Sequence, residues 1–104
     1  MKDSIYTIRE AAIENIKELT VIFGPNWSAR NVIPKLLALH TDINYLHRLT
    51  PLFGISSLSQ VVTIEIIRMQ FVPVLVTLQT DKVANIRMNV GKSVGKLIPI
   101  ILNP

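Results

Sequence analysis

The feature that most constrains the fold of this chain is an internal repeat with a period of 39 residues. Two charged residues recur at this spacing, and apolar residues recur with them. The charged positions are Asp3, Asp42 and Asp81 at one phase and Arg9, Arg48 and Arg87 at another. The apolar positions are Leu19, Leu58 and Leu97, then Ile16, Ile55 and Val94, then Phe23, Val62 and Ile101. Such a period is typical of solenoids, in which each unit is one supersecondary structure.

Apolar residues at spacings of three and four predict that each unit is helical. The first helix is expected at residues 4–23, and Gly24 and Pro25 end it. The other four helices are expected at 27–41, 43–62, 64–79 and 82–102. Asn26 and Thr63 are candidate caps for the helices that follow them.

One segment also has the composition of a strand, because residues 72–76 are rich in β-branched side chains. The repeat argues against this alternative. The equivalent segment one period earlier, residues 33–39, contains better helix formers, and related units share one conformation. Pro34 and Pro73 recur at one phase, so we interpret them as a tolerated position or a slight kink rather than a break.

These helices predict an all-α fold, an α-solenoid of antiparallel helix pairs of the HEAT type that forms a single segment over residues 1–104. We expect an unpaired second helix at 4–23, one repeat at 27–62 and another at 64–102. Charged residues make up only 17% of the chain, against roughly 25% in an average domain. A stack with apolar end faces has this composition, so we also expect self-association through those faces.

Composition and charge exclude several other classes of protein. No apolar run reaches the roughly 20 residues that cross a bilayer, so we expect a soluble chain without a membrane partner. Residues 43–104 carry six basic and two acidic side chains, but no basic run with interleaved aromatics supports binding of nucleic acid. The chain has no cysteine, which favours an intracellular setting, in the cytoplasm and also the nucleus.

No group of residues has the pattern of a catalytic, cofactor or metal site. Two histidines are seven residues apart without a third ligand, three glutamates form an acidic stripe on the first helix, and two glycines lie within a helical pattern. These residues are His40 and His47, then Glu10, Glu14 and Glu18, then Gly91 and Gly95. We therefore predict no enzyme, no cofactor and no bound metal.

The repeated aspartates and arginines allow two interpretations. They could form a row of anion-binding side chains. Alternatively, equal phases line up as a ladder in a stack, where an Asp of one turn pairs with an Arg of the same or the next unit. Each Asp also precedes a helix, where its carboxylate can accept amide hydrogens. We favour the structural ladder.

Three stretches carry a more specific resemblance than the repeat itself. They are Tyr6–Ala12, Asn44–Arg48 followed by Leu52 and Phe53, and Val83–Val90 followed by Lys92 and Ser93. Together with Phe23, Gly24 and Trp27, they resemble the HEAT-repeat scaffold (A) regulatory subunit of serine/threonine protein phosphatase 2A. The resemblance covers nearly the whole chain and is closest to the C-terminal repeats of that family, although its members carry many more repeats.

The resemblance implies a non-catalytic scaffold that binds the phosphatase catalytic subunit, and also regulatory subunits, through the turns within its repeats. The partner contacts that it assigns are Tyr6 and Arg9 in the first turn, Tyr45, His47 and Arg48 in the second, and Val83 and Arg87 in the third. For Arg48 and Arg87 this role competes with the structural ladder, so Tyr45 is the clearest candidate. The alternative is a generic HEAT-repeat adaptor, such as a transport or chromatin factor, that shares only the pattern of the repeats.

Overall fold

A computed structural model of the protein describes the backbone of residues 4–103 and the side chains of residues 9–103. Helices occupy most of this part of the chain, which contains no strand, and the predicted all-α class is confirmed. None of the helices between Ser4 and Asn103 combines the length and the apolar character that crossing a membrane requires. The elements in chain order are α1 (Ser4–Phe23), α2 (Pro25–Asn31), α3 (Ile33–Leu37), η1 (Ala38–Thr41), α4 (Tyr45–Leu58), α5 (Ile64–Ile66), η2 (Ile67–Phe71), α6 (Val72–Leu78) and α7 (Ala84–Leu102).

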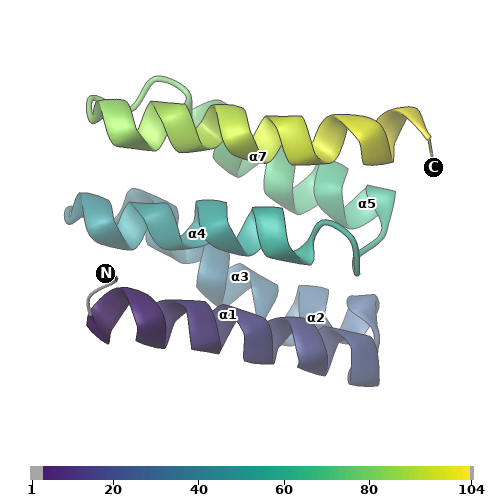
Figure 1. Ribbon diagram of the computed structural model, residues 1–104. Helices are drawn as coiled ribbons and strands as arrows, with labels where there is room; N and C mark the ends of the chain where they lie inside the picture. The colour runs from purple at the N-terminus through teal and green to yellow at the C-terminus, as the bar shows by residue number, and fades with distance from the viewer. Residues whose placement is uncertain (1–3, 104) are drawn as a thin grey trace.

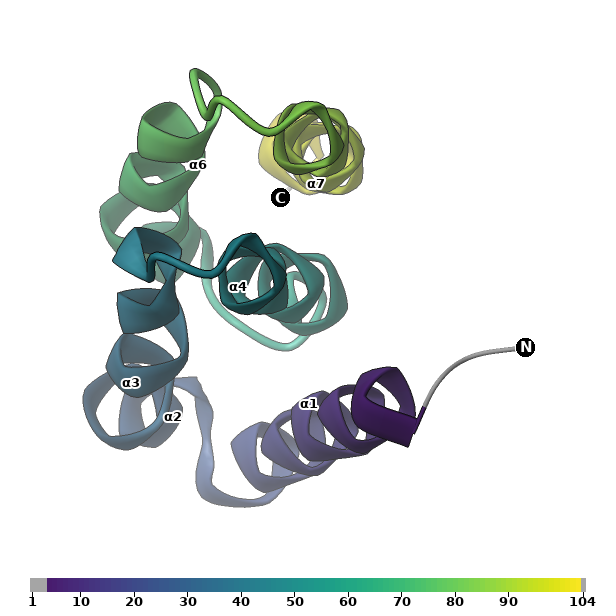
Figure 2. The ribbon, with the colours of Figure 1, turned by 90° about the vertical axis from the view of Figure 1, so that its left-hand side faces the viewer.

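The helices form two layers. In one layer α1, α4 and α7 lie side by side, with α4 in the middle (Figure 1). The shorter helices α2, α3 and α6 form the other layer. Figure 2 looks along the long helices and shows this layer to one side of them. The start of α3 at Ile33 precedes that of α6 at Val72 by one period, and the same offset separates the starts of α4 at Tyr45 and α7 at Ala84. The sequence repeat is therefore a repeat in space, as a solenoid requires.

The expected count of five helices is wrong, because the two short-helix segments are interrupted. The first changes direction at Val32, whose φ of −123° separates α2 from α3. The second passes through a π-helical stretch, η2, before α6. A proline stands at the start of each following helix, Pro34 in α3 and Pro73 in α6. Proline has no N–H to donate to the carbonyl four residues earlier, so a change in the hydrogen-bond pattern recurs with the proline. At Pro73 the helical run continues from Ile64 to Leu78, as expected for a tolerated position or a slight kink. At Pro34 the expectation is wrong, because Val32 separates α2 from α3.

The predicted ends of the long helices agree with the structure to within a few residues. The bounds of α1 are as expected, and Gly24, with φ of 97°, makes the turn that follows it. Thr63 caps α5 by accepting a hydrogen bond from the Ile66 amide at 3.2 Å. The expectation that Asn26 is a cap is wrong, because α2 already begins at Pro25.

The core lies between the two layers and is centred on α4. It consists of Ile33, Leu36, Leu37, Leu49, Leu52, Ile55, Leu58, Ile66, Ile67, Phe71, Val74, Leu75, Leu78, Ile86, Val90 and Leu97. The middle helix is covered on both sides by its neighbours α1 and α7, and by η1 and α3 from the other layer. This burial fixes the positions of the turns that precede α4 and α7.

Glycines in α4 and α7 are expected to respond in opposite ways to substitution by alanine. A Cβ at Gly54 would collide with the side chain of Leu36, whereas a Cβ at Gly91 or Gly95 would meet no atom within 4 Å. Gly54→Ala should lower the free energy of unfolding by about 1–2 kcal/mol through overpacking. Gly91→Ala should raise it by up to about 1 kcal/mol, because alanine is the better helix former. Urea denaturation of both variants tests this, and equal effects of the same sign would contradict it.

Candidate functional site

The turns before α4 and α7 lie at one edge of the molecule, next to the beginning of α1. Figure 2 looks onto this edge, with both turns toward the viewer. The predicted partner contacts belong to these turns, to the first residues of the helices that follow and to the beginning of α1. The side chain of Tyr6 is outside the part of the chain that the structure describes, so its contact with a partner stays a prediction.

The turn before α4 is closed by two local hydrogen bonds. The Asn44 amide donates to Oδ1 of Asp42 at 2.9 Å, and the Asn44 side chain in turn accepts a bond from the Leu46 amide at 2.9 Å. Asn44 is thus the N-cap of α4. Nδ1 of His47 lies 3.2 Å from Oδ1 of Asp42, close enough for an electrostatic contact but without the alignment of a hydrogen bond.

The turn before α7 uses its aspartate in the same way. Oδ1 of Asp81 accepts a hydrogen bond from the Val83 amide at 2.9 Å, and the Asp81 carbonyl accepts one from a terminal nitrogen of Arg87 at 2.6 Å. The expectation that the repeated aspartates accept amide hydrogens just before the following helices is confirmed for Asp42 and Asp81, whose donors are the amides of the N-cap residues Asn44 and Val83. Asp3 is outside the described residues.

Arg48 joins the two turns. Its Nε donates to Oδ2 of Asp81 at 2.8 Å and its Nη2 to Oδ1 at 3.1 Å, a bidentate pair between two turns. Its Nη1 donates to the carbonyls of Asp42 and Ile43, both at 2.9 Å. Only 10% of the Arg48 side chain and 8% of the Asp81 side chain are exposed. An Asp–Arg pair between neighbouring units is therefore present at this junction. The expectation was that an Asp pairs with the Arg of the same or the next unit, but Asp81 pairs with the Arg of the preceding unit.

The ladder is not uniform along the stack. Arg9 lies one period before Arg48, and Asp42 lies one period before Asp81. If the ladder were regular, Arg9 would therefore pair with Asp42. Instead, a terminal nitrogen of Arg9 donates to the carbonyl of Leu46, in the first turn of α4, at 2.6 Å. The expectation of an Asp–Arg pair at this junction is wrong, and His47 faces Asp42 there.

Both described aspartates have lowered pKa values. For Asp81 the largest cause is the hydrogen bond from Arg48, and the Val83 amide adds to it against the effect of burial. For Asp42 the largest cause is the Asn44 amide, followed by the His47 side chain, and these hold its pKa below the ordinary value. Both carboxylates therefore become protonated at a lower pH than an ordinary aspartate.

Apolar and aromatic side chains are exposed next to this polar framework. Tyr45 is 40% exposed and Leu46 42%, and Ile43, at the tip of the turn, is 99% exposed. The sequence reasoning selected Tyr45 but missed Ile43 and Leu46. An apolar residue between the two turn-forming residues Asp42 and Asn44 was the signal that could have identified Ile43, because such a position has no neighbours to bury it.

The other predicted contacts differ in how much of the side chain a partner could reach. His47 is half-exposed at the turn, and Arg87 is exposed. Val83 is half-buried and packs against the core. Arg48 is buried and uses four of its donors within the chain, so the geometry gives it a structural role. Contact of these residues with a partner stays a prediction.

The histidines have separate surroundings. A ring nitrogen of His40 lies 2.7 Å from the carbonyl of Leu37 within η1 and α3, whereas His47 faces Asp42. Within the described residues, no three side chains of His, Cys, Asp or Glu gather as metal ligands would.

Stacked helices that present a row of turns along one edge define this chain as an α-solenoid repeat protein of the HEAT type. No known family model matches the chain. Individual proteins of known name, however, are similar to it in sequence. The protein phosphatase PP2A regulatory A subunit of Schizosaccharomyces pombe is 43% identical over 74 residues, 71% of this chain and 12% of the relative. The protein of the same name from Saccharomyces cerevisiae is 36% identical over 88 residues, 83% of this chain and 14% of the relative.

A third relative, from Pisum sativum and of the same name, is 41% identical over 56 residues. Over the aligned residues, the chain belongs to the family of PP2A regulatory A subunits. It spans only 12–14% of the length of these relatives.

Proposed function

We propose that this chain is a non-catalytic scaffold segment that binds the catalytic subunit of a serine/threonine protein phosphatase through the turns before α4 and α7. The relatives are named as regulatory subunits of phosphatase PP2A. The resemblance of the turn sequences to the C-terminal repeats of that family is the basis for the choice of partner. Regulatory subunits are further partners that the same likeness implies.

The observation that carries this proposal is the exposed group formed by Ile43, Tyr45 and Leu46 on a closed turn. Its backbone is held by the Asp42 and Asn44 side chains and by Arg48, so little conformational entropy is lost when a partner binds. An aromatic side chain with a terminal hydroxyl, flanked by apolar residues, is the composition of an interface hot spot.

The turn before α7 adds a positively charged side chain, Arg87, to the apolar group on the turn before α4. Arg87 is exposed near the Asp81 carbonyl, and it can offer its remaining donors to an acidic group of the partner. Tyr45 would then supply contact area and Arg87 directed hydrogen bonds, with the Arg48–Asp81 pair fixing their separation.

Tyr45→Ala is expected to weaken binding of the isolated catalytic subunit by about tenfold or more, because a hot-spot side chain is removed without change to the core. Titration of the catalytic subunit in surface plasmon resonance measures the effect. Phe23→Ala is the matched control, since Phe23 is also an exposed aromatic residue but lies at the opposite end of the long helix α1.

Two results would contradict the proposal. One is a folded wild-type chain that does not bind the catalytic subunit. The other is an equal loss of affinity in Tyr45→Ala and Phe23→Ala. Binding of an unrelated acidic peptide in place of the catalytic subunit would favour the generic adaptor instead, given the basic balance of residues 43–104.

A further inference from the structure

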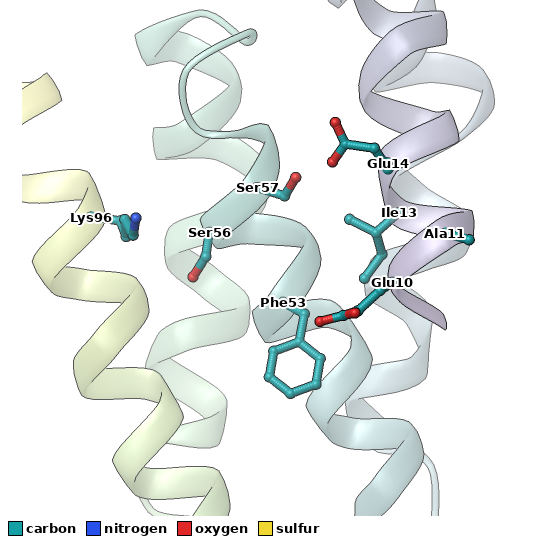
Figure 3. Close-up of a pocket in the computed structure, with 8 residues that line it drawn as sticks. All are labelled: Glu10, Ala11, Ile13, Glu14, Phe53, Ser56, Ser57 and Lys96. Atoms are coloured by element: carbon teal, nitrogen blue, oxygen red, sulfur yellow. The ribbon is translucent and has the colours of Figure 1, made fainter. Parts of the chain in front are cut away.

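A groove of about 630 Å³ lies over the middle long helix, and we call it the outer groove. Its floor consists of Phe53, Ser56 and Ser57 of α4. Its two walls come from the neighbouring helices, with Glu10 and Glu14 on α1 and Lys96 on α7 (Figure 3). The volume falls within the roughly 300–1,000 Å³ of known ligand-binding clefts.

The outer groove is on the side of α4 that faces away from the core. The core residues of α4 recur at every third position from Leu49 to Leu58. With 3.6 residues per turn, Phe53 and Ser57 lie on the opposite side of the helix. The groove is therefore on the broad face of the long-helix layer, and the short helices lie behind it. It is separate from the turns that precede α4 and α7.

Both walls of the groove lie within the stack and not at its ends. On α1, Ile13 lines the groove but is only 5% exposed, and Arg9, one turn earlier, donates to a carbonyl of α4. This side of α1 is thus the one that packs on α4. On α7, Lys96 follows Ser93, whose hydroxyl donates to a carbonyl of α4 at 3.1 Å. The shape of the groove therefore depends on contacts inside the described chain.

The two walls carry opposite charges. Glu10 and Glu14 are four residues apart and project from the same side of α1, whereas Lys96 is the charged residue on the α7 wall. All three side chains are exposed. Figure 3 shows Glu14 and Lys96 on opposite sides of α4, so they do not neutralise each other. An occupant that crosses α4 is complementary if it has a basic group at α1 and an acidic group at α7.

The separation of the walls indicates how long such an occupant is. Packed helices are about 8–10 Å apart, so α1 and α7 lie about 16–20 Å apart across α4. An extended chain advances about 3.3 Å per residue, and alternate side chains point to one face. Residues four positions apart in it are separated by about 13 Å, and their long side chains span the remaining distance. The residue midway between them points at the floor, where Phe53 offers an apolar contact.

We propose that the outer groove binds an extended segment of a partner protein in which a basic and an acidic residue flank an apolar one, each two positions from it. The basic residue pairs with the α1 wall, the acidic residue with Lys96, and the apolar residue packs on Phe53. The floor hydroxyls of Ser56 and Ser57 are available to the backbone of the segment. The inference is independent of the proposed phosphatase partner, because it concerns a different face of the molecule.

NMR titration of the chain with three terminally blocked peptides is the test. The matching peptide has the core Arg-Thr-Leu-Thr-Glu, and the two control peptides have Arg-Thr-Leu-Thr-Arg and Glu-Thr-Leu-Thr-Glu. The matching peptide should bind about threefold to tenfold more tightly than either control, because each control places a like charge against one wall. The amide signals of Ser56 and Ser57 should shift on binding.

Lys96→Glu makes both walls acidic, so it should transfer the preference from the matching peptide to Arg-Thr-Leu-Thr-Arg. A merely structural role of Lys96 would not change which peptide is preferred. Lys92→Glu is the matched control, because Lys92 is exposed one turn earlier on α7 but does not line the groove. This variant has the same net charge as Lys96→Glu and should keep the preference of the wild type. Far-UV circular dichroism confirms that both variants are folded.

The wild type alone is sufficient to overturn the proposal, even if a variant does not fold. Absence of binding of all three peptides would do so, and so would equal binding of the three. Signal shifts confined to the turns before α4 and α7 would place the peptide elsewhere and also overturn it. An unchanged preference in folded Lys96→Glu would overturn the assignment of the α7 wall.

Discussion

Arg48→Met is expected to lower the free energy of unfolding by about 3–5 kcal/mol, because it leaves the buried Asp81 carboxylate without its partner. The carbonyls of Asp42 and Ile43 also lose a donor. For a chain of this size, such a loss lowers the midpoint of thermal unfolding by about 12 °C or more. Differential scanning calorimetry measures the shift. Arg48→Lys should fall between the wild type and Arg48→Met, because an ammonium group cannot form the bidentate pair.

The matched control is Arg87→Met. Arg87 stands one period after Arg48 but is exposed, and its hydrogen bond reaches the Asp81 carbonyl rather than a carboxylate. Its substitution should cost about 0.5–1 kcal/mol. Similar midpoints for Arg48→Met and Arg87→Met would mean that the pair between the turns contributes nothing particular to stability.

Acidification is expected to destabilise the chain through the same pair. The pKa of Asp81 in the folded chain lies below its ordinary value of 3.8, so the folded state binds fewer protons than the unfolded state near that pH. The stabilisation is complete above about pH 3.8, and it is lost as the pH falls through the lowered pKa. Thermal midpoints measured across this range should therefore decrease with falling pH. The lowered pKa of Asp42 acts in the same direction.

Asp81→Asn identifies the contribution of the buried carboxylate. This variant should be about 3 kcal/mol or more less stable at neutral pH, because Arg48 then lacks an anion. Its midpoint should also depend less steeply on pH below 3.8, since only Asp42 remains of the two described aspartates. A double variant with Arg48→Met should lose less than the sum of the single losses. An unchanged acid profile in Asp81→Asn would contradict this assignment.

Most of the fold could be predicted because the repeat and the helical periodicity are carried by many residues. The bounds of α1, the two layers of helices and the cap at Thr63 follow from local patterns. The interruptions at Val32 and in η2 could not be derived in the same way. Proline is compatible with a first helical turn, with a kink or with a break, and the packing of the neighbouring helices decides among them.

The parts of the candidate site that could be predicted are those in which a residue contacts its near neighbours in sequence. Asp42 and Asp81 precede helices and bind amides two residues ahead, which the spacing indicates. Arg9 donates to the Leu46 carbonyl rather than to Asp42. Which acceptor it reaches depends on the exact distance between α1 and α4, and the sequence contains no direct signal for that distance. Exposure of Ile43 likewise depends on which neighbours reach the turn.

The position of Arg48 and Asp81 inside the stack has a consequence for ionic strength. Dissolved ions screen charges that face water, but they reach a pair with about a tenth of its surface exposed much less effectively. The separation between the turn of Tyr45 and the turn of Arg87 should therefore be the same in dilute and concentrated salt. Any sensitivity of partner binding to salt would then come from exposed charges such as Arg87, and not from a change in the scaffold that presents them.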